Sequence, residues 1–188
     1  MREAGRHVSQ FHPSEAKRLL GIPSMDRDHF RQIYLLIYEQ SGRKAPSAKW
    51  ACLSFEDIAS AAEVLRLMRE AGHAVGGRLH LHQIRRACIH LHDLGLDNPL
   101  LQASLTWHGD RLEADLGRII LDARSGQTIA RVFDRLRPLE HNVEDDPELL
   151  ARIQSAREEA RRRLDDFLHD QLGPEATHGE WTEPRPGH

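Results

Sequence analysis

The chain has few aromatic residues, two cysteines and no long apolar run, and each shortage excludes a class of protein. Aromatic side chains make up 5% of the 188 residues, so we expect a mostly aliphatic core. Cys52 and Cys88 do not have the spacing of a metal or redox motif, and we expect both to be reduced, buried thiols. No apolar stretch is long enough to span a bilayer, and residues 1–15 contain no hydrophobic signal segment. These features favour a cytoplasmic protein without a membrane partner.

The sequence also lacks the motifs of common enzyme classes. Residues 74–80, "AVGGRLH", contain two glycines but neither the lysine nor the strand-to-helix context of a phosphate-binding loop. No Ser-His-Asp or Cys-His grouping stands in a catalytic motif. Asp145 and Asp146 precede a helical pattern, where they are expected to cap the helix. We therefore expect a protein that is not an enzyme, with no catalytic residue and no cofactor.

Histidine is abundant in residues 79–95, "LHLHQIRRACIHLHDLG", which could form a metal site or a histidine-rich helix. If this stretch is helical, one buried stripe is predicted, made of Leu81, Ile84, Cys88 and Leu91. Only Cys88 and His92 then have the i, i+4 spacing of two ligands, and no further ligand set is evident. If residues 78–82 are a strand, His80 and His82 share a face, which leaves the metal site open. We favour a solvated helix face that could contact phosphate when protonated, and no metal.

Charge is divided unevenly between the two halves of the chain. The formal net charge is −3, but residues 1–92 carry +5 and residues 93–188 carry −8. A polyanion such as DNA would therefore bind to the first half, and a basic partner would bind to the second.

Apolar spacing in the first half predicts helices joined by short turns. Two helices, over residues 14–20 and 24–40, are separated by a turn that contains Gly21, which is the outline of a helix-turn-helix. A basic segment rich in Gly, Pro and Ser follows at 41–53 and would form a wing. Two further helices are predicted, one opening with a capping box of Ser54 and Asp57, the other over residues 80–94.

The second half predicts a small β portion and one long helix. Turn signals in residues 95–140 separate short alternating runs, "SLTW", "RLEAD" and "RIILDA", which we interpret as two antiparallel β-hairpins. Residues 141–173 form a long amphipathic helix, and residues 174–188 are expected to be a disordered tail. The apolar stripe of the helix suits a dimer seam or a partner helix, or packing against its own domain; it consists of Leu149, Ile153, Ala156, Ala160, Leu164 and Phe167.

The order of these segments resembles the DNA-binding domain of MerR-type regulators. "PSEAKRLLGIP" is similar to the first helix of that family, and "LSFEDI", "LRLMREAG" and "QIRRA" occupy the places of its later motifs. Residues 94–127 resemble the segment that follows such a domain in certain bacterial antitoxin and MerR-like proteins. The resemblance covers about residues 11 to 133. It implies a mainly α fold with a small β portion, in which residues 1–94 form a winged helix-turn-helix domain.

The resemblance also implies a DNA-binding transcriptional regulator that binds double-stranded DNA as a homodimer. The second helix would contact base edges through four side chains: Arg27, His29, Arg31 and Gln32. The phosphate backbone would be contacted by the wing and the first helix, through Arg43, Lys44, Lys49, Lys17 and Arg18.

A second hypothesis gives the same fold a protein partner. Asp26 and Asp28 lie at the end of the second helix that would enter the groove, where they oppose phosphate attraction. The chain would then be an antitoxin-like or adaptor protein, and its winged helix and acidic second half would bind a basic protein such as a toxin.

Overall fold

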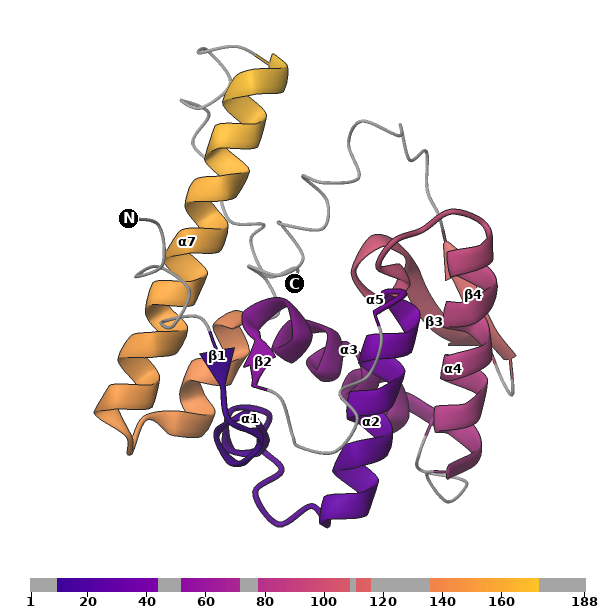
Figure 1. The fold of residues 1–188 in the computed structure, drawn as a ribbon, viewed down its shortest axis with the longest axis horizontal. Helices are drawn as coiled ribbons and strands as arrows, with labels where there is room; N and C mark the ends of the chain where they lie inside the picture. The colour runs from indigo at the N-terminus through magenta and orange to yellow at the C-terminus, as the bar shows by residue number, and fades with distance from the viewer. Residues whose placement is uncertain (1–9, 44–51, 72–77, 109–110, 116–135, 173–188) are drawn as a thin grey trace, which may run out of the picture.

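The computed structural model describes residues 10–43, 52–71, 78–108, 111–115 and 136–172 (Figure 1). The helices are α1 (Pro13–Leu19), α2 (Arg27–Gln40), α3 (Phe55–Ala71), α4 (Arg78–Asp93), α5 (Pro99–Gln102) and α7 (Pro147–Leu172), with a 3-10 helix η2 at Arg137–Val143. The strands are β1 (Gln10–Phe11), β2 (Leu53–Ser54), β3 (Ser104–His108) and β4 (Arg111–Asp115). The prediction of a mainly helical chain with a small β portion is confirmed.

The first two helices are capped by His12 and Asp26. At α1 the His12 ring accepts the backbone N–H of Ser14 at 3.4 Å, and the Glu15 carboxylate accepts the backbone N–H of His12 at 2.7 Å. Helix α2 begins at Arg27, later than the predicted residue 24, because the Asp26 carboxylate accepts two N–H groups of the first turn. Gly21, with a φ of +69°, ends α1 as expected, since glycine adopts this conformation without steric cost.

Helix α3 lies in the middle of the molecule, between α7 and η2 on one side and α2 and α4 on the other (Figure 1). Its predicted capping box is confirmed: Ser54 N donates to Asp57 Oδ2 at 3.0 Å, and Asp57 N donates to Ser54 Oγ at 3.2 Å. The body of α3 is buried on most of its circumference, including Ile58 and Val64, each 0% exposed. One hydrophobic cluster runs from Phe11 to Ala160, so the predicted segments 1–94, 95–140 and 141–173 share a single core.

The β portion consists of two separate antiparallel pairs. The hairpin β3–β4 forms as predicted, with Ser104 opposite Asp115 and His108 opposite Arg111. The second predicted hairpin, which begins at residue 118, lies outside the described residues. Strand β2 pairs with β1 at the start of the chain, Phe11 opposite Leu53. Most of the basic segment expected to form the wing, residues 44–51, lies outside the described residues, and β2 at its end is tied to the N-terminal strand β1.

Helix α7 packs its first half against its own chain, which corrects the dimer-seam prediction for four residues. Leu149, Ile153, Ala156 and Ala160 are 3%, 0%, 5% and 1% exposed, respectively. The docking is reinforced by Arg152, whose guanidinium donates to Glu15 Oε1 at 2.6 Å and lies 4.9 Å from the Phe11 ring centroid. Leu164 is partly exposed, and the side chain of Phe167 lies outside the described set. The stripe is therefore an intrachain packing face from residue 149 to 160, the alternative that the sequence had left open.

No helix in the described ranges is long and apolar enough to cross a membrane. The expected tail, residues 174–188, lies outside those ranges.

Candidate nucleic-acid interface

The turn between α1 and α2 is held by hydrogen bonds within the chain. Ile22 N donates to Lys17 O at 2.9 Å, and Met25 N donates to Ile22 O at 3.0 Å. The Lys17 ammonium donates to Met25 O at 2.9 Å and closes the turn from the side. These contacts fix the direction in which α2 leaves the turn, so the start of α2 has a defined place on the surface.

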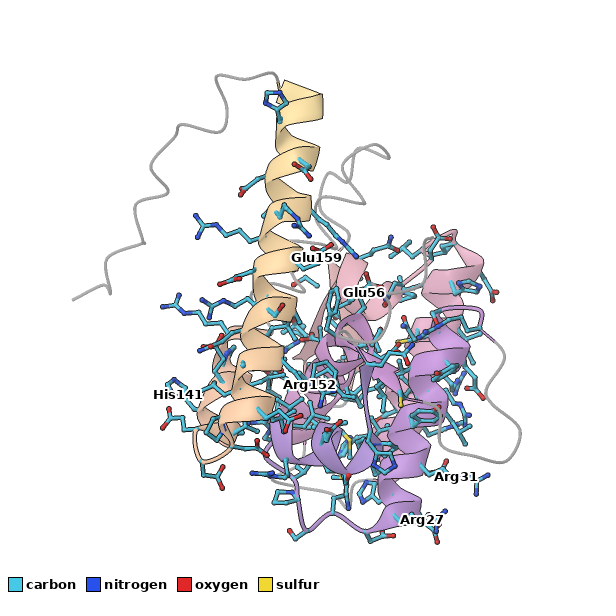
Figure 2. The ribbon with its side chains drawn as sticks, turned by 60° about the vertical axis from the view of Figure 1, so that its left-hand side comes forward. Arg27, Arg31, Glu56, His141, Arg152 and Glu159 are labelled. Carbon is cyan, nitrogen blue, oxygen red and sulfur yellow. The ribbon has the colours of Figure 1, made fainter. Side chains whose placement is uncertain are left out.

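Helix α2 buries one face and exposes the other. The buried face has helical spacing, since Phe30, Ile33, Tyr34 and Ile37 are at most 4% exposed. The opposite face begins at the N-terminal end of the helix and carries the exposed residues Arg27, Arg31 and Gln32, of which Gln32 also lines the cavity between α2 and α4. Figure 2 shows Arg27 and Arg31 at this end of α2, on the outside of the molecule. The exposed face thus combines two arginines and one amide, although Asp28 lies among them.

His29, the fourth predicted base-contacting residue, lies on the side of α2 that faces α4. It lines a cavity of about 450 Å³ together with side chains of both helices: Asp26, Asp28, Gln32, Leu36, Leu81, His82 and Arg85. The atom His29 Nε2 is buried and has no hydrogen-bond partner among the described residues. Arg85, one of these lining residues, donates twice through its guanidinium to the Glu39 carboxylate at 2.5 Å. His29 is therefore placed toward the neighbouring helix rather than outward beside Arg31.

Two predicted phosphate contacts, Arg18 and Arg43, are engaged in ion pairs within the chain. Arg18 donates to Asp146 at 2.6 Å and to Asp145 at 3.2 Å, which ties α1 to the start of α7. Arg43 pairs with the buried carboxylate of Asp57, and its guanidinium carbon lies 4.5 Å from the Tyr38 ring centroid. Burial acts to lower the pKa of Arg43, but the hydrogen bond and charge of Asp57 raise it above its ordinary value. Both arginines have structural partners that the sequence did not indicate.

The remaining predicted contacts of the wing, Lys44 and Lys49, lie outside the described residues. Lys17 is partly buried beside the turn, as described above.

The four histidines of α4 have different surroundings, which corrects the prediction of one solvated face. His80 is 9% exposed and packs edge-on against the Trp107 ring, with 5.3 Å between ring centroids. His92 Nδ1 lies 3.0 Å from Leu96 O, whereas His82 and His90 are exposed. The predicted stripe of α4 is confirmed, since its members are at most 9% exposed. Within the described part of the chain, no group of three or more His, Cys, Asp or Glu side chains could hold a metal ion.

The two thiols also differ from each other. Cys88 is buried as expected, and burial, aided by the charge of Glu63, raises its pKa to about 12. The expectation of a buried Cys52 is wrong, because this residue lies exposed just before β2. Cys88 is thus held as an unreactive thiol at neutral pH.

Sequence reasoning missed a cleft between α1 and α2. Its volume is about 340 Å³, and its lining residues are His12, Pro13, Ser14, Lys17, Arg27 and Phe30. Lys17 and Arg27 had each been predicted to contact DNA, but His12 and Ser14 had not been assigned to a site. The missing signal was the histidine cap of α1, which brings the imidazole to the same end of the molecule as Arg27.

No family model, curated protein or solved structure matches this chain.

Proposed function

We propose that the chain is a DNA-binding transcriptional regulator that reads double-stranded DNA through the exposed face of α2, in the manner of MerR-type proteins. The observation that carries this proposal is the arrangement of α2. One face of this helix is apolar and buried, and its N-terminal half presents two arginines and an amide to solvent. A helix of this kind fits the major groove, where arginine pairs with guanine and glutamine with adenine. Arg31 and Gln32 are the side chains assigned to base edges.

The partners of the other basic residues refine the proposal. Arg18 and Arg43 hold the fold together, so we assign the phosphate contacts to Lys17 and Arg27 and to Lys44 and Lys49 of the basic loop. Binding then depends on salt, because each neutralised phosphate releases condensed counterions.

The test starts from a pool of fluorescein-labelled duplexes of randomised sequence, which is passed through several rounds of selection for binding to the protein. Binding is measured by fluorescence anisotropy before and after selection, at two salt concentrations. Wild-type protein should enrich a sequence motif and bind it less tightly at the higher salt concentration. Arg31→Ala should lose about 1–3 kcal/mol of binding free energy and the base preference at one position. The matched control is Arg111→Ala on β4, an exposed arginine that lies outside α2 and outside the part of α7 assigned to the dimer contact below. Failure of the wild-type protein to enrich any motif, or an equal loss in both variants, would contradict the proposal.

A homodimer belongs to the same proposal, since paired half-sites require two copies of α2. The part of α7 beyond residue 160 is the element we assign to this contact, because it extends past the body of the molecule (Figure 1). Sedimentation of wild-type protein and of Leu164→Asp tests this assignment. The variant should be monomeric if residues 161–172 carry the contact.

The second candidate function is an antitoxin-like or adaptor role. It is favoured by the exposed acidic residues of α7, among them Asp165 and Asp166, and by the −8 charge of residues 93–188. This function would be favoured over DNA reading if the chain co-purified with a basic protein that salt releases and if the purified chain itself showed no detectable binding to DNA.

A further inference from the structure

Two large apolar side chains are exposed at α4. Ile89 is 45% exposed and Leu94, just past the end of the helix, is 57% exposed, and no other large hydrophobic side chain in the described ranges belongs to this exposed class. Residues 82, 86, 89 and 93 recur at helical spacing on the side of α4 opposite to its buried stripe, and we call them the outer face of α4. Ile89 therefore lies on an exposed face with polar residues on both sides of it.

Arg86 and Asp93 flank Ile89 on this face and carry opposite charges. Both side chains are exposed, and neither forms an ion pair or a side-chain hydrogen bond within the described part of the chain. They are separated by about 10 Å along the helix axis, which is too far for the pairing of residues three or four apart. The neighbouring Arg85, by contrast, is bound to Glu39. The outer face thus has an unpaired positive charge on one side of an exposed isoleucine and an unpaired negative charge on the other.

Such a face is complementary to itself when two copies of the helix meet in antiparallel orientation. In a two-fold contact, residue i of one copy lies opposite residue j of the other, and j lies opposite i. If the two-fold axis passes beside Ile89, Arg86 of each copy lies opposite Asp93 of the second copy, and the two isoleucines pack next to the axis. Both charges are then paired and the exposed apolar surface is covered. A parallel arrangement would instead place like charges opposite each other.

We propose that α4 is a self-association surface, on which the outer face of α4 from a second copy of this chain docks in antiparallel orientation. Figure 1 shows α4 and α7 on opposite sides of the molecule, with α3 between them. The α4 contact therefore leaves residues 161–172 of α7 available for the dimer contact assigned above. It joins α7-linked dimers to one another, and it does not depend on DNA.

The small size of the outer face makes this contact weak. Helix α4 has 16 residues and is about 24 Å long and about 10 Å wide, so the contact is much smaller than the roughly 800 Å² per partner that a stable interface buries. Leu164→Asp protein is then monomeric at low protein concentration, where the α7 contact is tested. It associates through α4 only when the protein concentration is raised.

The first experiment is sedimentation equilibrium of Leu164→Asp protein without DNA, from low micromolar to millimolar concentration. Arg86→Asp and Asp93→Arg, each added to this protein, should weaken association about tenfold or more, because each places two like-charge pairs across the axis. Both substitutions together should restore association, because the exchanged charges are again opposite. The control is Glu158→Arg, a charge reversal at an exposed position in the first half of α7, which should leave association unchanged.

The rescue by the doubly reversed variant separates a contact between copies from an effect on the fold. The absence of association at every concentration would overturn the proposal. A doubly reversed variant that associates no more strongly than the single ones would also overturn it, provided that each variant melts within a few degrees of its parent.

The second experiment locates the contact on the surface. ¹⁵N-labelled Leu164→Asp protein is diluted from millimolar to micromolar concentration, and the amide chemical shifts are followed. The largest changes should occur at Arg86, Ile89 and Asp93, and they should be absent in Ile89→Asp. Changes confined to α2 or α7 would mean that another surface associates, and the α4 assignment would fall. Because neither experiment contains DNA, a failure of the DNA-binding proposal and a failure of the α4 assignment are distinguished.

Discussion

The substitution Ile153→Ala tests whether the first half of α7 belongs to the core of its own chain. Ile153 is 0% exposed, and it lies on a stripe whose neighbours Leu149 and Ala156 are also buried. Removing three carbon atoms from such a site costs about 2–5 kcal/mol, because transfer free energy is lost and a cavity remains. For a chain of this length each kcal/mol lowers the melting temperature by roughly 2–4 °C, so the expected drop is about 4–20 °C.

The assay is thermal unfolding followed by circular dichroism at protein concentrations that differ by a factor of one hundred. We expect the same drop in melting temperature at each concentration, since the contact is intrachain. Ser155→Ala, at an exposed position on the same helix, is the control and should change stability by less than about 0.5 kcal/mol. A drop that shrinks or grows with concentration would mean that the stripe is buried between subunits, and the intrachain packing would be refuted.

Four further predictions concern charged and thiol groups. Arg43→Gln should destabilise the fold by about 1–3 kcal/mol in urea titration, because a buried carboxylate loses its ion pair while the arginine itself is partly exposed. At pH 8 in native buffer, a thiol reagent should modify Cys52 and spare Cys88, which reacts only in denaturant. The raised pKa of Cys88 also implies that stability falls as pH rises above the ordinary value of 9.0, where the unfolded chain ionises first. Glu15→Gln should destabilise the protein at pH 7, through loss of the ion pair with Arg152. The difference in stability from wild type should shrink as pH falls below 4.5, because a carboxylate whose pKa is lowered by folding loses its stabilising effect when it becomes protonated. Equal urea midpoints for Arg43→Gln and wild type, two reactive thiols at pH 8, a stability that stays constant as pH rises above 9.0, or an undiminished Glu15→Gln deficit at pH 3 would contradict these four expectations in turn.

Elements with strong apolar periodicity could be predicted from the sequence. The buried faces of α2 and α4 follow the 3.6-residue spacing, and the capping box at Ser54 and Asp57 fixes the start of α3. Such features depend on residues that are near one another in the sequence. The hairpin β3–β4 was predictable for the same reason, since its turn signal at His108 lies between two alternating runs.

The roles of individual arginines could not be predicted, because their partners are distant in sequence. Arg18 pairs with Asp146, which follows it by 128 residues, and nothing local distinguishes Arg18 from the exposed Arg31. The pairing of Arg43 with Asp57 crosses the basic loop and removes one expected phosphate contact. His80 is a similar case, since its burial depends on Trp107 of the β3 strand.

The central claim is that the exposed face of α2 contacts DNA, and amide chemical-shift mapping tests it most directly. The measurement is a titration of ¹⁵N-labelled protein with the duplex enriched from the randomised pool, at low and at moderate salt. The account predicts that the largest shifts occur at Arg27, Arg31 and Gln32, and that they weaken at the higher salt concentration. Shifts confined to α7, or no shifts with any duplex while the protein remains folded, would contradict it.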